Sequence, residues 1–151
     1  MKMRTVPFLI FLIYTPYAAI ASETQGCEQI AAKFFDLLSE GKSGEAVDSV
    51  FKTNPYLDKV ADAIVQVKSS LASSEKLIGN YRDSSLILDK KLGDRVIYLY
   101  YLAAFERQPI KFEFLCYKPN EKWVIQNLFF SDKVLDDIRD FVKYDLFKKP
   151  K

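Results

Sequence analysis

The fold is decided by residues 94–130, which read DRVIYLYYLAAFERQPIKFEFLCYKPNEKWVIQNLFF. Apolar and polar side chains alternate along much of this stretch, a period of two that is typical of β-strands. Two short breaks, Gln108-Pro109 and Pro119-Asn120, interrupt it, and the link Leu92-Gly93-Asp94 precedes it. Such tight connections join neighbouring antiparallel strands, so the sequence predicts a meander. The four expected strands are roughly 77–90, 94–107, 110–118 and 122–130.

Helical periodicity replaces this alternation on both sides of the predicted sheet. Before it, apolar side chains recur every three or four residues in three runs, which predicts three helices. Gly41 ends the first run, and Asn54-Pro55 opens the third, because Asn accepts a backbone N–H and Pro needs none to donate. After the sheet, Ser131 can cap a last helix. We therefore expect one α+β domain over residues 22–151, with N-terminal helices packed on a curved four-stranded antiparallel meander, plus a C-terminal helix.

Residues 1–21 have the features of a signal peptide. Lys2 and Arg4 precede an apolar core from Val6 to Ile13, and Ala19-Ile20-Ala21 fits the cleavage pattern. The apolar core is shorter than the about 20 residues that a membrane-spanning helix needs, so an uncleaved anchor is the less favoured alternative. We expect a periplasmic or secreted protein with no membrane span after cleavage.

Composition excludes several classes of function. Removing Lys2 and Arg4 leaves 20 basic and 20 acidic residues, so the formal net charge falls from +2 to zero and bulk charge does not attract nucleic acid. The chain contains no histidine, which excludes an imidazole-based catalytic triad and a histidine-ligated metal. Carboxylates are scattered singly and no CxxC or glycine-rich phosphate loop occurs. We expect no metal and no cofactor.

Two cysteines, Cys27 and Cys116, remain in the predicted mature chain. An oxidising compartment permits a disulfide between them. Such a bond would close a long loop and stabilise the fold by roughly 4 kcal/mol. Two buried free thiols are the alternative, because unpaired cysteine behaves as a small hydrophobe.

Alternation assigns two faces to the predicted sheet. If Gln108-Pro109 is a two-residue turn, the odd-numbered side chains of residues 94–107 share a face with the even-numbered ones of 110–118. This first face is nearly free of charge and should pack on the helices. The candidate ligand-binding residues are Tyr101, Trp123 and Asn127 on this face and Phe34 on the first predicted helix. A purely structural role in the core is the alternative for each of them.

The second face carries more apolar area than a solvated sheet face should. The residues expected on it are Tyr98, Tyr100, Leu102, Leu115, Tyr117, Gln126 and Leu128. Because this mixture of aromatic, aliphatic and polar side chains is typical of an interface, we expect a homodimer through this face. The C-terminal helix folding over it is the alternative. Glu106 and Lys111 should form a cross-strand ion pair on the same face.

The order of elements, helices and then a curved antiparallel meander, resembles the nuclear-transport-factor-2-like superfamily, which includes ketosteroid-isomerase-like proteins. The resemblance covers roughly residues 29–131 and includes the stretch from Leu92-Gly93-Asp94-Arg95 through Tyr117-Lys118-Pro119 to Trp123. It implies a cone-shaped sheet around the long helices, a pocket at the open end and frequent dimerisation across the sheet. Members of the superfamily usually carry an extra short strand between the second and third helices, and Lys52-Thr53-Asn54 leaves little room for one. The C-terminal helix is an addition to the usual plan of the superfamily. A cystatin-like helix-plus-sheet fold is the nearest alternative.

Three functions remain open at this level. The favoured one is an exported non-catalytic domain that binds a small apolar ligand or a protein partner as a homodimer. The resemblance implies a second, an isomerase- or dehydratase-like enzyme in which a carboxylate moves a proton beside Tyr101. Asp36, Asp83 and Asp89 are candidates for that carboxylate, although spacing compels none of them. The third is a structural accessory protein of the cell envelope, which needs no ligand cavity.

Overall fold

The computed structural model describes residues 25–147, except for the side chains of residues 25, 58–60 and 145–147. The predicted signal peptide, residues 1–21, lies outside this part of the chain. The elements are α1 (Gln25–Ser39), α2 (Ser43–Phe51), the 3-10 helix η1 (Pro55–Val60), α3 (Ala61–Ile78), β1 (Tyr81–Leu92), β2 (Val96–Phe105), β3 (Pro109–Tyr117), β4 (Val124–Ser131) and α4 (Val134–Phe147). This order confirms the predicted α+β class, with helices, a four-stranded antiparallel meander and a C-terminal helix.

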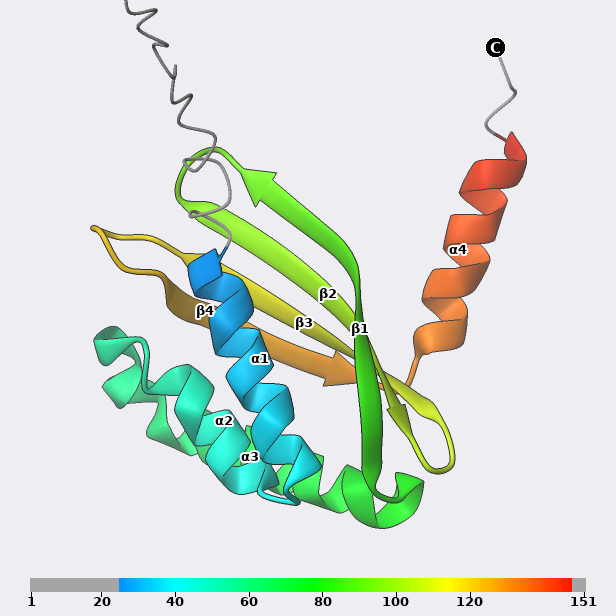
Figure 1. The fold of residues 1–151 in the computed structure, drawn as a ribbon, viewed down its shortest axis with the longest axis horizontal. Coiled ribbons are helices and arrows are strands. Elements are labelled where there is room, and N and C mark those ends of the chain that lie inside the picture. Colours follow the sequence, from blue (N-terminus) through cyan, green and yellow to red (C-terminus); the bar gives the residue numbers. More distant parts are fainter. Residues whose placement is uncertain (1–24, 148–151) are drawn as a thin grey trace, which may run out of the picture.

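The sheet separates two unequal layers of helices. Its strand order is β1-β2-β3-β4, and all neighbours are antiparallel. Helices α1, α2 and α3 cover one face, whereas α4 stands apart from them and extends away from the sheet (Figure 1). We call the face that meets α1 the inner face and the opposite one the outer face. The outer face therefore has only a partial cover within the described chain.

Local sequence signals set the ends of the N-terminal helices. Gly41 has a φ of 73° and ends α1, as predicted, because a left-handed residue closes the last turn. The side chain of Asn54 accepts a hydrogen bond from the backbone N–H of Tyr56 at 3.1 Å, and Pro55 follows at the first helical position. The predicted cap is thereby confirmed, although it opens η1, which continues into α3 at Ala61.

The turn between β2 and β3 lies earlier in the chain than predicted. Ala104 pairs with Pro109, so the chain reverses over residues 105–108. The backbone N–H groups of Glu106 and Arg107 donate hydrogen bonds to carbonyls at the end of α3 and just after it, which ties the reversal to that helix. The register differs from the predicted one by an even number of residues. The odd-numbered side chains of β2 therefore still share a face with the even-numbered ones of β3, as predicted.

The earlier turn also changes the ion pairs at this end of the sheet. Lys111 lies opposite Leu102, so the predicted pair between Glu106 and Lys111 is wrong. Glu106 instead binds the guanidinium of Arg82. Lys111 is left to pair on the outer face with a carboxylate of α4.

A β-bulge reverses the faces of the second half of β4. Cys116 pairs with Ile125, whereas Leu115 pairs with Asn127, so β4 carries one extra residue between the two pairs. Leu128 consequently lies in the core with 4% of its surface exposed, and Asn127 is exposed on the outer side. The predicted faces of Asn127 and Leu128 are therefore wrong, because alternation carried across a bulge inverts every later side chain.

The core fills the space between the helices and the inner face. Phe34, Phe112 and Phe114 are fully buried, and the ring centroid of Phe34 lies 5.3 and 5.4 Å from those of the other two. Cys27 of α1 and Cys116 of β3 form a disulfide with a Cα–Cα distance of 6.0 Å, and both are fully buried. Of the two alternatives left open by the sequence, the disulfide is therefore the one observed, and it fastens α1 to the sheet.

Two side chains satisfy the free edge of β4. The backbone N–H of Ile125 donates to Oγ1 of Thr53 at 2.9 Å, and its carbonyl accepts from Nδ2 of Asn54 at 2.7 Å. Asn54 is only 4% exposed. Its side chain thus serves a strand carbonyl and the first turn of η1 at once, and the edge offers fewer groups to another strand.

Replacing Asn54 by alanine should lower the free energy of unfolding by about 2–3 kcal/mol, because it removes the cap of η1 and leaves the carbonyl of Ile125 without its donor. Urea unfolding followed by circular dichroism measures the change. Asn120→Ala, at an exposed asparagine in the β3–β4 turn, is the matched control and should stay within about 0.5 kcal/mol of the parent. Equal effects of the two substitutions would contradict the role assigned to Asn54.

Candidate functional site

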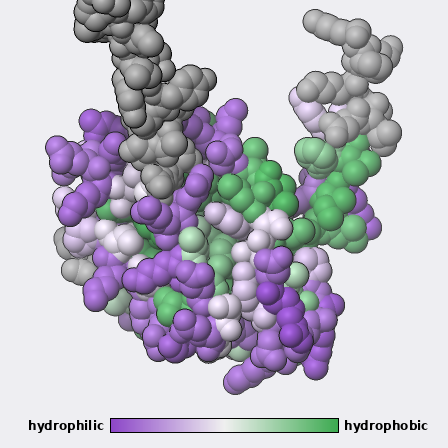
Figure 2. Space-filling model, in the orientation of Figure 1, coloured by the Kyte–Doolittle hydropathy of each residue, from purple (hydrophilic) through white to green (hydrophobic). Residues whose placement is uncertain are grey.

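A groove lies between the outer face and α4. Its walls are apolar, with Ile87 and Leu88 of β1 on one side and Ile138 and Phe141 of α4 on the other. These four side chains are 49–68% exposed, and the groove has a volume of about 540 Å³. Figure 2 shows apolar surface gathered where the body of the molecule approaches α4. The groove is within the size range of small-molecule sites, and it is the candidate functional site.

Five polar side chains line the same groove and form one connected network. Oδ2 of Asp137 accepts hydrogen bonds from the hydroxyl of Tyr100 at 3.0 Å and from Nζ of Lys111 at 2.6 Å. Nζ of Lys111 also lies 3.4 Å from Oε1 of Glu113, and Glu113 lies close enough to the hydroxyl of Tyr98 to raise its pKa. Because Asp137 belongs to α4 and the other four to β2 and β3, the network holds α4 to the outer face.

The network shifts the pKa values of several of its members. Burial, followed by the hydrogen bond to Asp137, raises the pKa of Tyr100 to about 12. Burial and the neighbouring Glu113 raise the pKa of Tyr98 as well. Burial acts to lower the pKa of Lys111, but the carboxylates of Asp137 and Glu113 outweigh it, so this pKa is raised. At neutral pH the network therefore contains two uncharged phenols and one ammonium group beside two carboxyl groups.

Aromatic side chains fill the place where the sequence predicts a ligand. Phe34 is fully buried, with its ring centroid 5.3 Å from those of Phe35 and Phe112. Tyr101 lies on the inner face, as predicted, and is half-buried with its ring 5.0 Å from that of Phe35. Burial, followed by the charge of Glu28, raises the pKa of Tyr101. Phe34 and Tyr101 thus both pack against the ring of Phe35, and neither lines the groove.

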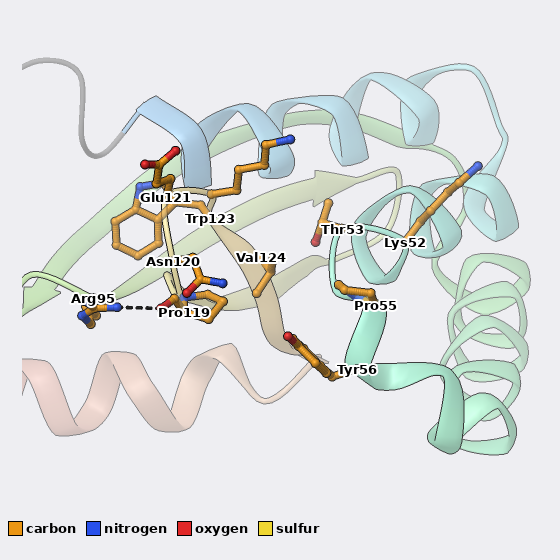
Figure 3. Close-up of a pocket in the computed structure, with 11 residues that line it drawn as sticks. Lys52, Thr53, Pro55, Tyr56, Arg95, Pro119, Asn120, Glu121, Trp123 and Val124 are labelled. Atoms are coloured by element: carbon orange, nitrogen blue, oxygen red, sulfur yellow. Dashed lines mark hydrogen bonds between the residues drawn. The ribbon is translucent and has the colours of Figure 1, made fainter.

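The other two predicted ligand-binding residues lie elsewhere. Asn127 is exposed, as the bulge in β4 requires. Trp123 lines a second hollow, of about 1080 Å³, between the β3–β4 hairpin and the start of η1 (Figure 3). There Arg95 donates hydrogen bonds to the carbonyls of Lys118 and Pro119 at 3.2 and 2.7 Å. Val124 is the one branched aliphatic side chain in the lining of this hollow, whereas the groove has three such side chains and a phenyl ring, so the groove is the better candidate for an apolar ligand.

Most residues of the predicted dimer surface share the outer side of the sheet. Those that are half-buried or exposed there are Tyr98, Tyr100, Leu102, Leu115, Tyr117 and Gln126. Leu128 is the exception, since it belongs to the core. Sequence reasoning missed the wall that β1 supplies, and it gave the C-terminal helix over this face only as the alternative to a dimer; α4 does cover the face in part. The exposed run Leu86-Ile87-Leu88 in an edge strand and the apolar stripe of α4 were the available signals.

The fold and this groove define the chain as an antiparallel meander backed by three helices, with an apolar groove beneath a fourth. Within the described residues, no group of three His, Cys, Asp or Glu side chains could hold a metal ion. In the same part of the chain, no helix is both long and apolar enough to cross a membrane. Comparison with protein-family models, with curated proteins and with solved structures finds no match.

Proposed function

We propose that this chain is an exported, non-catalytic binding domain that acts as a homodimer, with the outer face and α4 forming the contact between copies. The observation that carries this proposal is the concentration of exposed apolar side chains on that side of the molecule. Beyond the four walls of the groove, they are Leu92, Tyr117, Phe129, Leu135, Val142 and Tyr144, each 38–64% exposed.

The exposed apolar area is of the size that a second copy can cover. Aromatic side chains bury about 150–250 Å² each and aliphatic ones less, so the six that lie outside the groove, roughly half exposed, present on the order of 500 Å². A stable interface buries about 800 Å² per partner, of which rather more than half is apolar. A two-fold contact places the same patch on both copies, so one apolar face is sufficient to build it. The resemblance to the nuclear-transport-factor-2-like superfamily, whose members associate across the sheet, supports the same arrangement.

The two alternative functions have less support. An isomerase-like enzyme needs a carboxylate beside Tyr101, but Asp36, Asp83 and Asp89 are all exposed. The carboxylate whose charge acts on Tyr101 is that of Glu28, and Tyr101 does not line the groove. A purely structural protein requires no ligand-sized cavity, whereas the groove measures about 540 Å³.

Sedimentation equilibrium of the purified protein tests the homodimer. We expect a dimer at micromolar concentration. Leu135→Asp introduces a charge among the exposed apolar side chains of α4 that lie outside the groove. It should raise the dissociation constant of the dimer about thirtyfold, equivalent to about 2 kcal/mol.

Leu77→Asp is the matched control for this experiment. Leu77 is 73% exposed and lies on α3, which belongs to the layer over the inner face. The same chemical change there should leave the dissociation constant unaltered. A parent chain that stays monomeric at high micromolar concentration, or equal weakening by both substitutions, would contradict the proposed dimer.

A further inference from the structure

The polar network of the groove carries more negative than positive charge. Its single ammonium group, Nζ of Lys111, lies 2.6 Å from Asp137 and 3.4 Å from Glu113. The side chain of Lys111 is only 13% exposed. Because two carboxylates already hold this ammonium group, it has little to offer an anionic ligand. One ion pair is enough to fasten α4, so the second carboxylate leaves the groove with a surplus negative charge.

Two hydrogen-bond donors of the network are also in use, whereas acceptors remain. The hydroxyl of Tyr100 and Nζ of Lys111 both donate to Asp137. Within the described residues, Asp137 accepts through Oδ2 alone, so its Oδ1 is left to accept from a ligand. The side chains of Asp137 and Glu113 are 38% and 24% exposed, so both are accessible. The groove therefore offers negative charge and acceptors at its polar part.

The apolar walls determine what the rest of a ligand must be. Ile87 and Leu88 face the groove from β1, and Ile138 and Phe141 face it from α4. None of the four carries a polar atom in its side chain, so contact with them stabilises a bound aliphatic chain by removing its apolar surface from water. The groove thus combines an apolar channel with a negatively charged, acceptor-rich patch.

We infer that the groove binds a single-chain aliphatic primary amine, with the chain between β1 and α4 and the ammonium group at Asp137 and Glu113. Charge-assisted hydrogen bonds to carboxylates favour the ammonium group. The same carboxylates repel a fatty acid of equal length, which supplies the discrimination. This inference rests on the outer face being the binding face of the proposed function, but it does not require the homodimer.

Calorimetric titration with decylamine, decanol and decanoate tests the inference, since the three probes share one chain and differ in the head group. Below micelle-forming concentrations at neutral pH, decylamine should bind at least about tenfold more tightly than decanoate, with decanol between them. Phe141→Ala should weaken the three probes by similar factors, because it removes apolar wall and no charge.

Glu113→Gln examines the source of the preference. It removes the surplus charge but leaves the pair between Lys111 and Asp137, so the ratio of decylamine to decanoate affinity should fall to about threefold or less. Glu121→Gln, at an exposed residue of the β3–β4 turn, makes the same charge change outside the groove and should keep the full ratio.

Three results would overturn the inference: decanoate binding as tightly as decylamine, no binding of decylamine, or a full ratio retained in Glu113→Gln. None of them alters the sedimentation result, so the homodimer would stand or fall separately. Conversely, a monomeric chain that prefers decylamine would contradict the homodimer and leave the ligand class in place.

Discussion

Reducing the disulfide between Cys27 and Cys116 should lower the free energy of unfolding by about 4–5 kcal/mol, because the bond restricts a long loop in the unfolded chain. The two cysteines are 89 residues apart, so nearly all of the helical layer and most of the sheet lie within that loop. Both side chains are fully buried, and the thiols that result from reduction behave as small apolar groups in the same place. The loss should therefore come mainly from the unfolded state.

Urea unfolding of the oxidised and the reduced protein, followed by circular dichroism, measures this loss. Domains of this size are stable by about 5–15 kcal/mol, so the midpoint should fall strongly on reduction. The double variant Cys27→Ala/Cys116→Ala is the control: it should be as unstable as the reduced parent and should not respond to reductant. Equal stability of the oxidised and reduced forms would show that the bond contributes nothing to the fold.

The faces of β2 and β3 could be predicted because they depend only on a period of two. Tyr98 and Tyr100 lie on the outer face and Tyr101 on the inner one, and an even shift of the turn leaves these positions unchanged. The turn itself could not be placed, because the backbone N–H groups of Glu106 and Arg107 hold it by hydrogen bonds to carbonyls at residues 80 and 78. These acceptors, at the end of α3 and just after it, are distant in the sequence. Local alternation contains no information about such a contact.

The second half of β4 marks the limit of the same reasoning. Gln126 and Asn127 are adjacent polar residues between the buried Ile125 and Leu128, a break in alternation that a bulge explains. The groove was harder to foresee. Helical periodicity predicts an apolar stripe on α4, but the docking of α4 depends on the pairing of Asp137 with a lysine on β3, and that pairing is long-range.

Phe34→Ala should lower the free energy of unfolding by about 3–5 kcal/mol, because it opens a cavity at the centre of the aromatic core. Phe34 is fully buried, and its ring meets that of Phe114 edge to face at 78° with centroids 5.4 Å apart. It also contacts the ring of Phe112 at 5.3 Å. The sequence suggested Phe34 as a ligand contact, and the same substitution separates that role from a role in the core. Urea unfolding measures the role in the core, and calorimetric titration with decylamine measures the role in ligand binding.

Phe129→Ala is the matched control, since Phe129 lies on the outer face with 48% of its surface exposed. Truncating a half-exposed ring removes less buried area and leaves no closed cavity, so the loss of stability should be about 1 kcal/mol or less. If Phe34 acts only in the core, Phe34→Ala should leave the affinity for decylamine unchanged. The titration is made without urea, at a temperature at which the variant is folded. A loss of stability as small as that of Phe129→Ala, together with a changed affinity for decylamine, would instead return the ligand site to the inner face. A ligand site in the groove under α4 and a ligand site in the aromatic core thus predict opposite effects of Phe34→Ala on the affinity for decylamine.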